Sequence, residues 1–315
     1  MRANTIGTCN MSDNEFLQSR TIFFNIFSYM GLPLSREPDD ADVFVIGLPY
    51  DLGTSGRSGT RGGPGGIRSA SGNLRWEENR WPWGFRAFDR IRVADYGDLE
   101  FPTGNHEALF AEVEAHYGNL LAAGKTMLTF GGDHFVTLPL LRAHHAHHGK
   151  LAMIHFDAHT DTYREEDAVY NHGSMFYHAP REGIIDPGKS IQVGIRTEYT
   201  ESRHEFEVIS AAVANDLPVD EILARIHARV GDHPCYLTFD IDCLDPAYAP
   251  GTGTPVAGGL TSDRALKIIR GLQGINLIGM DVVEVAPSYD RAEITSLAAA
   301  TLGLEMLYVL ASGRA

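Results

Sequence analysis

The sequence contains few cysteines, and Cys9, Cys235 and Cys243 are the only three among 315 residues. Three thiols at these spacings form neither a disulfide framework nor a cysteine-ligated zinc site, which fits a reducing compartment. Residues 1–20 lack the apolar core of a secretory leader, and we expect no apolar run of membrane-spanning length. The sequence therefore predicts a cytoplasmic protein with no membrane partner.

Positive charge is also scarce, with 26 Lys and Arg residues against 41 Asp and Glu residues and a net charge of −15. Such an acidic chain argues against nucleic acid or an anionic membrane as a partner, and it suits a cationic small molecule. The glycine-rich stretch 53–68 lacks the Gly-Lys-Ser/Thr ending of a P-loop. We interpret it as a tightly turning loop that lines a cleft or a subunit contact, with arginines that serve structure.

Apolar strand-like runs alternate with helical patterns through most of the chain, without a linker or a break in composition. This alternation predicts an α/β fold, a single-domain three-layer α/β/α arrangement around a mostly parallel sheet. We expect an N-terminal arm at 1–40 and a catalytic domain at 41–315. The expected strands are 42–48, 91–94, 126–130, 151–156, 191–195, 236–239 and 277–283, and the expected helices are 106–123, 136–148, 219–230, 262–271 and 293–310.

Histidines and aspartates gather in three short clusters, at 131–134, 157–161 and 240–242, and each cluster follows an apolar run. Such runs are typical of buried parallel strands, whose carboxyl ends hold the ligands of open α/β sheets. In an extended chain the side chains at i, i+2 and i+4 point to one side. Acid or imidazole groups fill those positions in the second and third clusters, so we expect them to converge.

The converging groups predict a site for two divalent metal ions, because clustered buried carboxylates need neutralising cations. An oxygen-rich ligand set with some imidazole and no thiolate favours Mn²⁺. Taken singly, each aspartate is equally compatible with a cap, a turn or a surface acid. The predicted ligands of two Mn²⁺ per subunit are His134, Asp157, His159, Asp161, Asp240 and Asp242. Asp133 is expected to orient a ligand and not to bind metal itself.

Two further residues are candidates for chemistry beside this site. His172 is suited to pass a proton to a leaving amine, although a loop histidine bonded to backbone is the alternative. Glu284 follows the apolar strand 277–283 and is suited to hold a planar guanidinium through two hydrogen bonds. Its alternative is a solvent-facing acid at the mouth of the cleft. The histidines of 144–148 fit the end of a helix, and Cys243 fits a buried structural thiol.

The three clusters resemble the signature motifs of the ureohydrolases, the arginase and agmatinase family, and the similarity runs from about residue 43 to residue 310. These motifs are highly specific. The resemblance implies an arginase-like fold with one Mn²⁺ held by His134, Asp157, Asp161 and Asp240, and the other by Asp157, His159, Asp240 and Asp242. It also implies that Asp157 and Asp240 bridge the ions, that His172 shuttles a proton and that Glu284 binds the guanidinium.

Within the family the resemblance is nearest to the bacterial agmatinases. It implies hydrolysis of agmatine to putrescine and urea, a step of polyamine biosynthesis, by attack of a metal-bridging hydroxide on the guanidinium carbon. Glu284 would orient the guanidinium, Asp161 would accept the proton of the attacking water, and His172 would help to protonate the leaving amine. The family further implies a homo-oligomer, either a trimer or a hexamer.

The loop 162–171 bears on the choice of substrate. Arginases use a longer loop there, rich in Asn, Thr and Ser, to hold the substrate's α-carboxylate. This chain has Glu165, Glu166 and Asp167 instead. Carboxylates would repel arginine's own carboxylate and tolerate the distal amine of agmatine, although solvated loop acids remain the alternative.

Three alternatives stay open. One is another amidinohydrolase, for guanidinobutyrate, another guanidino acid or guanidine, and an arginine facing the cleft would support the guanidino acids. A second is a metal-dependent deacetylase of the same fold, which uses one zinc and a different ligand pattern. The third is a non-catalytic protein that keeps the metal for stability, against which His172 and Glu284 argue.

Overall fold

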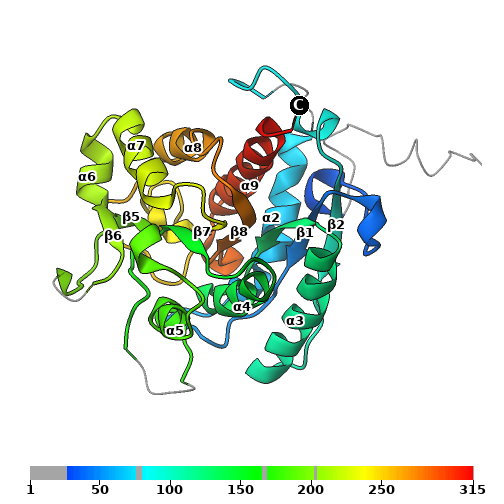
Figure 1. Ribbon diagram of the computed structural model, residues 1–315, viewed down its shortest axis with the longest axis horizontal. Helices are drawn as coiled ribbons and strands as arrows, with labels where there is room; N and C mark the ends of the chain where they lie inside the picture. Colours follow the sequence, from blue (N-terminus) through cyan, green and yellow to red (C-terminus); the bar gives the residue numbers. More distant parts are fainter. Residues whose placement is uncertain (1–26, 76–79, 165–168, 202–203, 315) are drawn as a thin grey trace, which may run out of the picture.

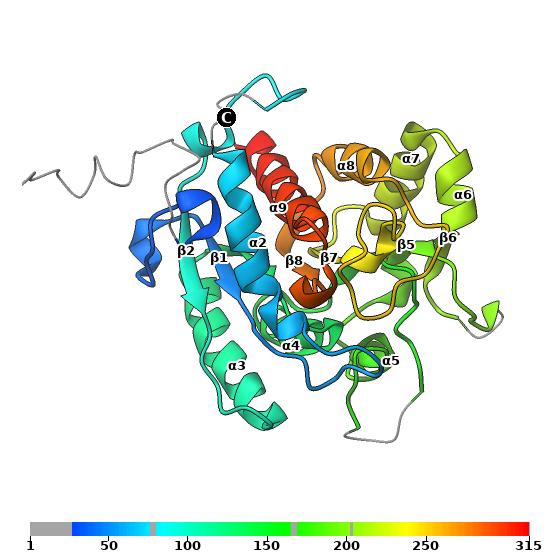
Figure 2. The ribbon, with the colours of Figure 1, turned by 180° about the vertical axis from the view of Figure 1, so that it is seen from behind.

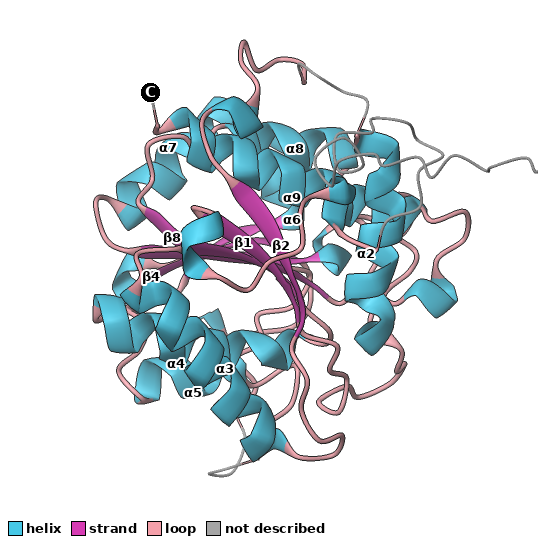
Figure 3. Cartoon of the chain, turned by 90° about the vertical axis from the view of Figure 1, so that its right-hand side faces the viewer, coloured by secondary structure: helices cyan, strands magenta, loops and turns pink. Residues whose placement is uncertain are grey.

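The structure is a computed structural model that describes residues 27–75, 80–164, 169–201 and 204–314. In this part of the chain one sheet of eight strands runs in the order β2-β1-β3-β8-β7-β4-β5-β6. All of its strand pairs are parallel. Helices cover both faces of the sheet, so the predicted three-layer α/β/α fold is confirmed (Figures 1 and 3).

The central strands are buried on both faces, which explains why they appear in the sequence as continuous apolar runs. Side chains of β1 alternate between two cores: Phe44 and Ile46 belong to one, and Val43 and Val45 to the other. The strands are β1 Val43–Gly47, β2 Val93–Asp98, β3 Thr126–Phe130, β4 Ala152–Phe156, β5 Ile191–Ile195, β6 Glu207–Ser210, β7 Cys235–Asp240 and β8 Leu277–Val283.

The helices divide between the two faces of the sheet, as Figures 2 and 3 show. One face is covered by α3 His106–Ala122, α4 Thr137–His148 and α5 Met175–Arg181. The other is covered by α2 Gly63–Ser71, α6 Ala211–Asp216, α7 Val219–Val230, α8 Ser262–Arg270 and α9 Ile294–Ser312. The expected strands and helices all occur, with ends displaced by a few residues at most.

The glycine-rich stretch differs from its prediction in its second half. Residues 53–59 turn tightly as expected, but α2 begins at Gly63. A Cβ at Gly63 would lie 2.7 Å from the carbonyl oxygen of Val285, and one at Gly66 would lie 2.8 Å from the ring of Pro287. Glycine weakens a helix by itself, and here it permits this close packing. The short elements α5, β6 and α6 were also not predicted, because their patterns are too brief to show a period.

The closing helix α9 differs from the expectation that no apolar run is long enough to span a membrane. Its 19 residues are long and apolar enough to cross a membrane by length and composition alone. However, 72% of that window is buried inside the protein, where α9 packs against α2 and α8. A core helix passes the same test of length and composition, so α9 is weak evidence for a membrane span.

Residues 1–26 of the expected N-terminal arm lie outside the described residues. Residues 28–31 pack against the rest of the protein, whereas Phe27 and Leu34 are exposed. Tyr29 is fully buried, and its hydroxyl donates to the carbonyl of Ala300 in α9 over 2.6 Å. Its backbone N–H donates to the Asp95 side chain on the edge strand β2 over 2.7 Å.

Candidate metal centre

The predicted ligands lie at the carboxyl ends of β3, β4 and β7, and β8 lies between β3 and β7 in the sheet. His134 follows β3, Asp157 follows β4 and Asp240 ends β7. Because parallel strands all end at the same edge, this topology brings together residues that are more than a hundred positions apart in the sequence.

The turn after β3 shows why the first cluster has its sequence. A Cβ at Gly132 would lie 1.6 Å from the carbonyl oxygen of Tyr50, so only glycine fits there. The next residue, Asp133, accepts hydrogen bonds from the backbone N–H groups of Gly53, over 2.6 Å, and Phe135, over 3.1 Å. Asp133 therefore fixes the backbone on both sides of the site, and its carboxylate makes no hydrogen bond to the imidazole of His134 among the described contacts.

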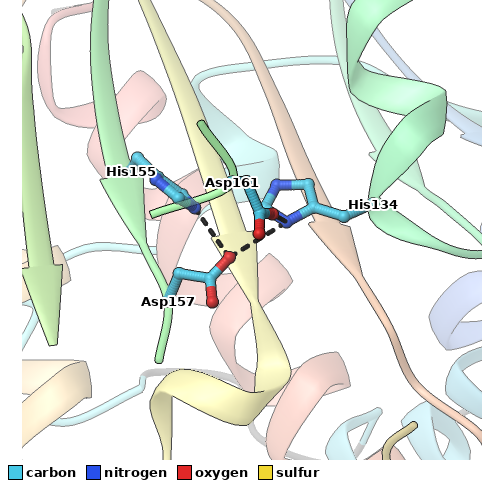
Figure 4. A group of neighbouring side chains, drawn as sticks. All are labelled: His134, His155, Asp157 and Asp161. Atoms are coloured by element: carbon cyan, nitrogen blue, oxygen red, sulfur yellow. Dashed lines mark hydrogen bonds and ion pairs between the residues drawn. The ribbon is translucent and has the colours of Figure 1, made fainter. Parts of the chain in front are cut away.

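His134 forms the centre of a first group of side chains. Its Nδ1 atom lies 3.1 Å from Asp157 Oδ2, 2.9 Å from Asp161 Oδ2 and 3.3 Å from Asp240 Oδ2. All four residues are buried. Figure 4 shows Asp157 and Asp161 beside this imidazole.

A second group shares Asp157 with the first. His159 Nδ1 lies 3.2 Å from Asp157 Oδ1 and 3.1 Å from Asp242 Oδ2. Asp157 thus turns one oxygen toward each group, as a carboxylate that bridges two metal ions would. The backbone holds this arrangement, because Ala158 N–H donates to Asp242 and Asp242 N–H donates to Asp240.

The charges of the cluster fit a site for cations. Among the described residues no salt bridge joins these carboxylates to a lysine or an arginine. Burial, followed by the charges of Asp242 and Asp157, raises the pKa of Asp240 well above its usual value. Burial and the charge of Asp157 raise the pKa of Asp161 to about 7. The carboxylates therefore repel one another unless positive charge lies between them.

His155 is a further residue of the site, which the three sequence clusters do not include. It is fully buried, and its Nε2 lies 2.8 Å from Asp157 Oδ2 (Figure 4). Its Nδ1 accepts from the Gln192 amide over 2.8 Å, so Nε2 carries the proton and donates to Asp157. The signal was present, because His155 lies two residues before Asp157 and continues its alternation. His155 also falls within the group of possible ligands around His134.

His172 and Glu284 lie beside the two groups and contact each other. His172 Nδ1 donates to Glu284 Oε1 over 2.9 Å, and its Nε2 lies 2.9 Å from the Ser55 hydroxyl. Burial by itself lowers the pKa of His172, but the hydrogen bond to Glu284 and its charge outweigh burial and raise the pKa to about 9. The Nε2 atom also accepts from the backbone N–H of Ser55 over 3.1 Å, so His172 is bonded to backbone, as the alternative expects, and to the Glu284 carboxylate as well.

Glu284 is completely buried and not solvent-facing. Its Oε1 also accepts from the backbone N–H of His134 over 2.8 Å, whereas Oε2 has no hydrogen-bond partner in the described part of the chain. Glu284 and Asp161 both have positive φ angles, of 64° and 51°. Side chains other than glycine rarely adopt this conformation, and such strain clusters at functional sites.

A cavity of about 580 Å³ opens onto the two groups. Residues 53–55 of the glycine-rich stretch line it, which confirms that this part faces a cleft. Thr254 of the turn-rich segment 245–255 also lines it and donates to Asp242 over 3.2 Å. One arginine, Arg164, lies among the lining residues. The acids Glu165, Glu166 and Asp167 lie outside the described residues.

Comparison with known proteins gives consistent matches. The model of the Arginase family matches residues 41–308. An agmatinase of Serratia proteamaculans is 57% identical over 311 residues, covering 98% of each chain. The structure of a hypothetical agmatinase from Burkholderia thailandensis is 47% identical with a TM-score of 0.90, covering 93% of each chain. Proclavaminate amidino hydrolase from Streptomyces clavuligerus is 39% identical with a TM-score of 0.88, covering 93% of this chain and all of that one.

Proposed function

The chain belongs to the arginase family of hydrolases, and we propose that it hydrolyses agmatine to putrescine and urea with two Mn²⁺ ions per subunit. The observation that carries the proposal is Asp157, whose two oxygens face two separate groups of His and Asp side chains. The likeness to an agmatinase over 98% of the chain supports the choice of substrate. A cytoplasmic location and a trimer or hexamer remain part of the proposal.

The donor set fits the proposed metal ions. Imidazole and carboxylate ligands without thiolate suit Mn²⁺, and the buried repulsion among the aspartates calls for cations. His134, Asp157, Asp161 and Asp240 would hold one ion, and Asp157, His159, Asp240 and Asp242 the other. When bound, such a pair acts as a Lewis acid that lowers the pKa of water and makes a nucleophile available at neutral pH.

The protein's own residues would bind and orient the substrate. Glu284 Oε2 is buried and unpaired among the described residues, so it is free to accept an N–H of the guanidinium. Water adds to the guanidinium carbon, and the bond from that carbon to the amine nitrogen breaks. Asp161 would accept the proton of the attacking water. His172, which holds its proton up to a pH of about 9, would donate to the leaving nitrogen.

A second candidate function is supported by Arg164. An arginine in the wall of the cavity would repel the distal amine of agmatine and attract a carboxylate. The likeness to proclavaminate amidino hydrolase also points toward other amidino compounds. We therefore retain hydrolysis of a guanidino acid, such as 4-guanidinobutyrate, as the alternative.

The test is release of urea by the Mn²⁺-loaded protein with agmatine, arginine, 4-guanidinobutyrate and guanidine, compared at equal concentrations. We expect the highest kcat/KM with agmatine. A higher kcat/KM with 4-guanidinobutyrate would show that the proposed substrate is wrong, and the proposed metal chemistry would stand. Failure to bind Mn²⁺ would contradict the proposal as a whole.

A further inference from the structure

A chain of buried polar groups holds the back of His134, on the side away from the carboxylates of the metal centre. His134 Nε2 lies 2.9 Å from the Thr238 hydroxyl, and that hydroxyl donates to Asp281 Oδ1 over 2.6 Å. Thr238 lies on β7 and Asp281 on the neighbouring strand β8. All three side chains are fully buried. Two central strands therefore fix the orientation of one predicted ligand.

Asp281 is surrounded by hydroxyl groups. Its Oδ2 accepts from Thr137 over 2.9 Å and from Tyr236 over 3.0 Å, in addition to the bond from Thr238 to Oδ1. In the part of the chain that the structure describes, Asp281 has no salt bridge. A buried carboxylate without a cation costs stability, so a function beyond packing is needed to explain it.

The direction of these hydrogen bonds decides which nitrogen of His134 carries a proton. The Thr238 hydroxyl has one hydrogen and gives it to Asp281. It can then only accept from His134, so Nε2 carries a proton and Nδ1 is the nitrogen that is left to give its lone pair to a metal ion. Nδ1 faces three carboxylate oxygens and has no hydrogen-bond partner among the described residues. A lone pair in that position is suited to a cation.

Hydrogen bonds that ran in the opposite direction, from Asp281 through Thr238 to His134, would place the proton on Nδ1. If Thr238 donated to His134 Nε2, Asp281 would have to donate to Thr238, and Nδ1 would carry the proton. An N–H at Nδ1 would point at the carboxylates and exclude a metal ion from that nitrogen. Only the order that ends on an ionised Asp281 leaves His134 able to bind metal.

We propose that Asp281 is a positioning residue which, through Thr238, holds His134 in the orientation and tautomer that bind metal. The inference rests on the metal centre of the proposed function. It applies to one of the two ions, because His134 belongs to only one of the two ligand groups. Loss of the Asp281–Thr238 link should therefore weaken one Mn²⁺ site and leave the other.

The test compares Thr238→Val with Thr238→Ser in the full chain. Valine has nearly the shape of threonine but no hydroxyl, whereas serine keeps the hydroxyl. Mn²⁺ is titrated into metal-free protein, and free Mn²⁺ is followed by electron paramagnetic resonance. We expect Thr238→Val to bind one of its two ions about 10- to 100-fold more weakly, the usual effect of losing such a partner. Thr238→Ser should remain close to wild type.

Two further variants separate positioning from packing. Tyr236→Phe removes another hydrogen bond to Asp281 and leaves the Thr238–His134 contact in place, so its Mn²⁺ affinity should be unchanged. In Asp281→Asn the amide oxygen would face Thr137 and Tyr236, and the NH₂ group would face Thr238. That arrangement reverses the direction of the hydrogen bonds from His134 through Thr238 to residue 281, so it should weaken Mn²⁺ binding at the same single site. It carries the test if Thr238→Val does not fold.

The outcomes distinguish the inference from the function on which it rests. If wild type binds two Mn²⁺ and both Thr238→Val and Asp281→Asn bind them with wild-type affinity, the positioning role is wrong and the metal centre stands. An equal loss in Tyr236→Phe would also overturn the inference, because the effect would then be general to the core. If wild type binds no Mn²⁺, both the inference and the proposed function fail.

Discussion

His172 and Glu284 are joined by a hydrogen bond of 2.9 Å between Nδ1 of the histidine and Oε1 of the glutamate. The glutamate follows the last strand, and the histidine lies in the loop before α5, more than a hundred residues earlier. The pair unites the predicted proton donor with the predicted substrate-binding carboxylate. The hydrogen bond to Glu284 and the charge of Glu284 also explain why the pKa of His172 rises to about 9 in spite of burial.

The first prediction concerns this histidine. His172→Asn should lower kcat by about 10²- to 10⁴-fold, the usual contribution of a positioned general acid, with two Mn²⁺ still bound. Because the pKa of His172 is raised, its proton is present at neutral pH and lost as the pH rises through about 9. Wild-type kcat should therefore decline above that pH, and the variant should lack this decline. An unchanged kcat, or loss of metal, would contradict the assigned role.

Much of the fold and the cluster could be predicted from local patterns. The close spacing of Asp157, His159 and Asp161 predicts that they lie near one another, and apolar runs locate the strands that precede the clusters. The extended conformation expected for residues 157–161 is wrong, because they follow β4 in a bend and Asp161 has a φ of 51°. Asp157 at the centre of two groups agrees with the bridging position that the family resemblance implies. Each of these inferences depends on spacing within a few residues, which a sequence displays directly.

Other features depend on contacts that spacing does not reveal. Asp281 lies inside an apolar strand, and nothing beside it in the sequence indicates that Thr238 and Tyr236 reach it from the next strand. The free oxygen of Glu284 and the position of Arg164 in the cavity wall likewise depend on tertiary structure. α2 was missed because glycine is a poor helix former by itself, and its close packing outweighs that propensity.

The second prediction concerns the charge of Asp240. In metal-free protein the buried carboxylates of Asp240, Asp242 and Asp157 repel one another, so Asp240→Asn should stabilise that form, by about 1 kcal/mol. With Mn²⁺ bound, wild type should instead be more stable than Asp240→Asn. Wild type should gain about 2.7 kcal/mol at a metal concentration of 100 times Kd, and the variant should gain much less. Thermal unfolding with EDTA and with Mn²⁺ measures both effects.

The reversal itself is the decisive result for Asp240. A variant less stable than wild type in both conditions would indicate only that the substitution disturbs packing. A variant that gains as much stability from Mn²⁺ as wild type does would show that Asp240 is not a ligand.

The third prediction concerns Arg164 in the wall of the cavity. Arg164→Ala removes a positive charge, so kcat/KM for 4-guanidinobutyrate should fall by about two- to fivefold and that for agmatine should not fall. The size follows from the ~0.5–1 kcal/mol typical of exposed charge interactions. Arg181→Ala is the control, because Arg181 is exposed on α5, where its guanidinium lies over the ring of Tyr177. If kcat/KM changed equally for both substrates, Arg164 would not determine which substrate the protein prefers.

The last prediction concerns Glu305 of α9, which ties three segments together. Its fully buried carboxylate accepts hydrogen bonds of 2.6 Å from Arg270, Trp83 and Arg80. Burial by itself would raise the pKa of Glu305, but these hydrogen bonds outweigh it and lower the pKa below its usual value. The stabilisation is therefore complete above the unfolded-state value of 4.5 and is lost as the pH falls through the lower folded pKa.

Glu305→Gln removes the negative charge that pairs with the guanidinium groups of Arg80 and Arg270, so the free energy of unfolding at pH 7 should fall by about 3 kcal/mol. The loss should shrink as the pH falls below 4.5, because the unfolded wild-type chain then binds a proton that the folded protein takes up only at lower pH. Urea unfolding of metal-free protein at several pH values measures this without interference from metal release. Asp89→Asn, which breaks the exposed Arg86–Asp89 pair, should change stability by less than ~0.5 kcal/mol. A difference between wild type and Glu305→Gln that stays constant into acid would mean that packing, and not charge, makes Glu305 stabilising.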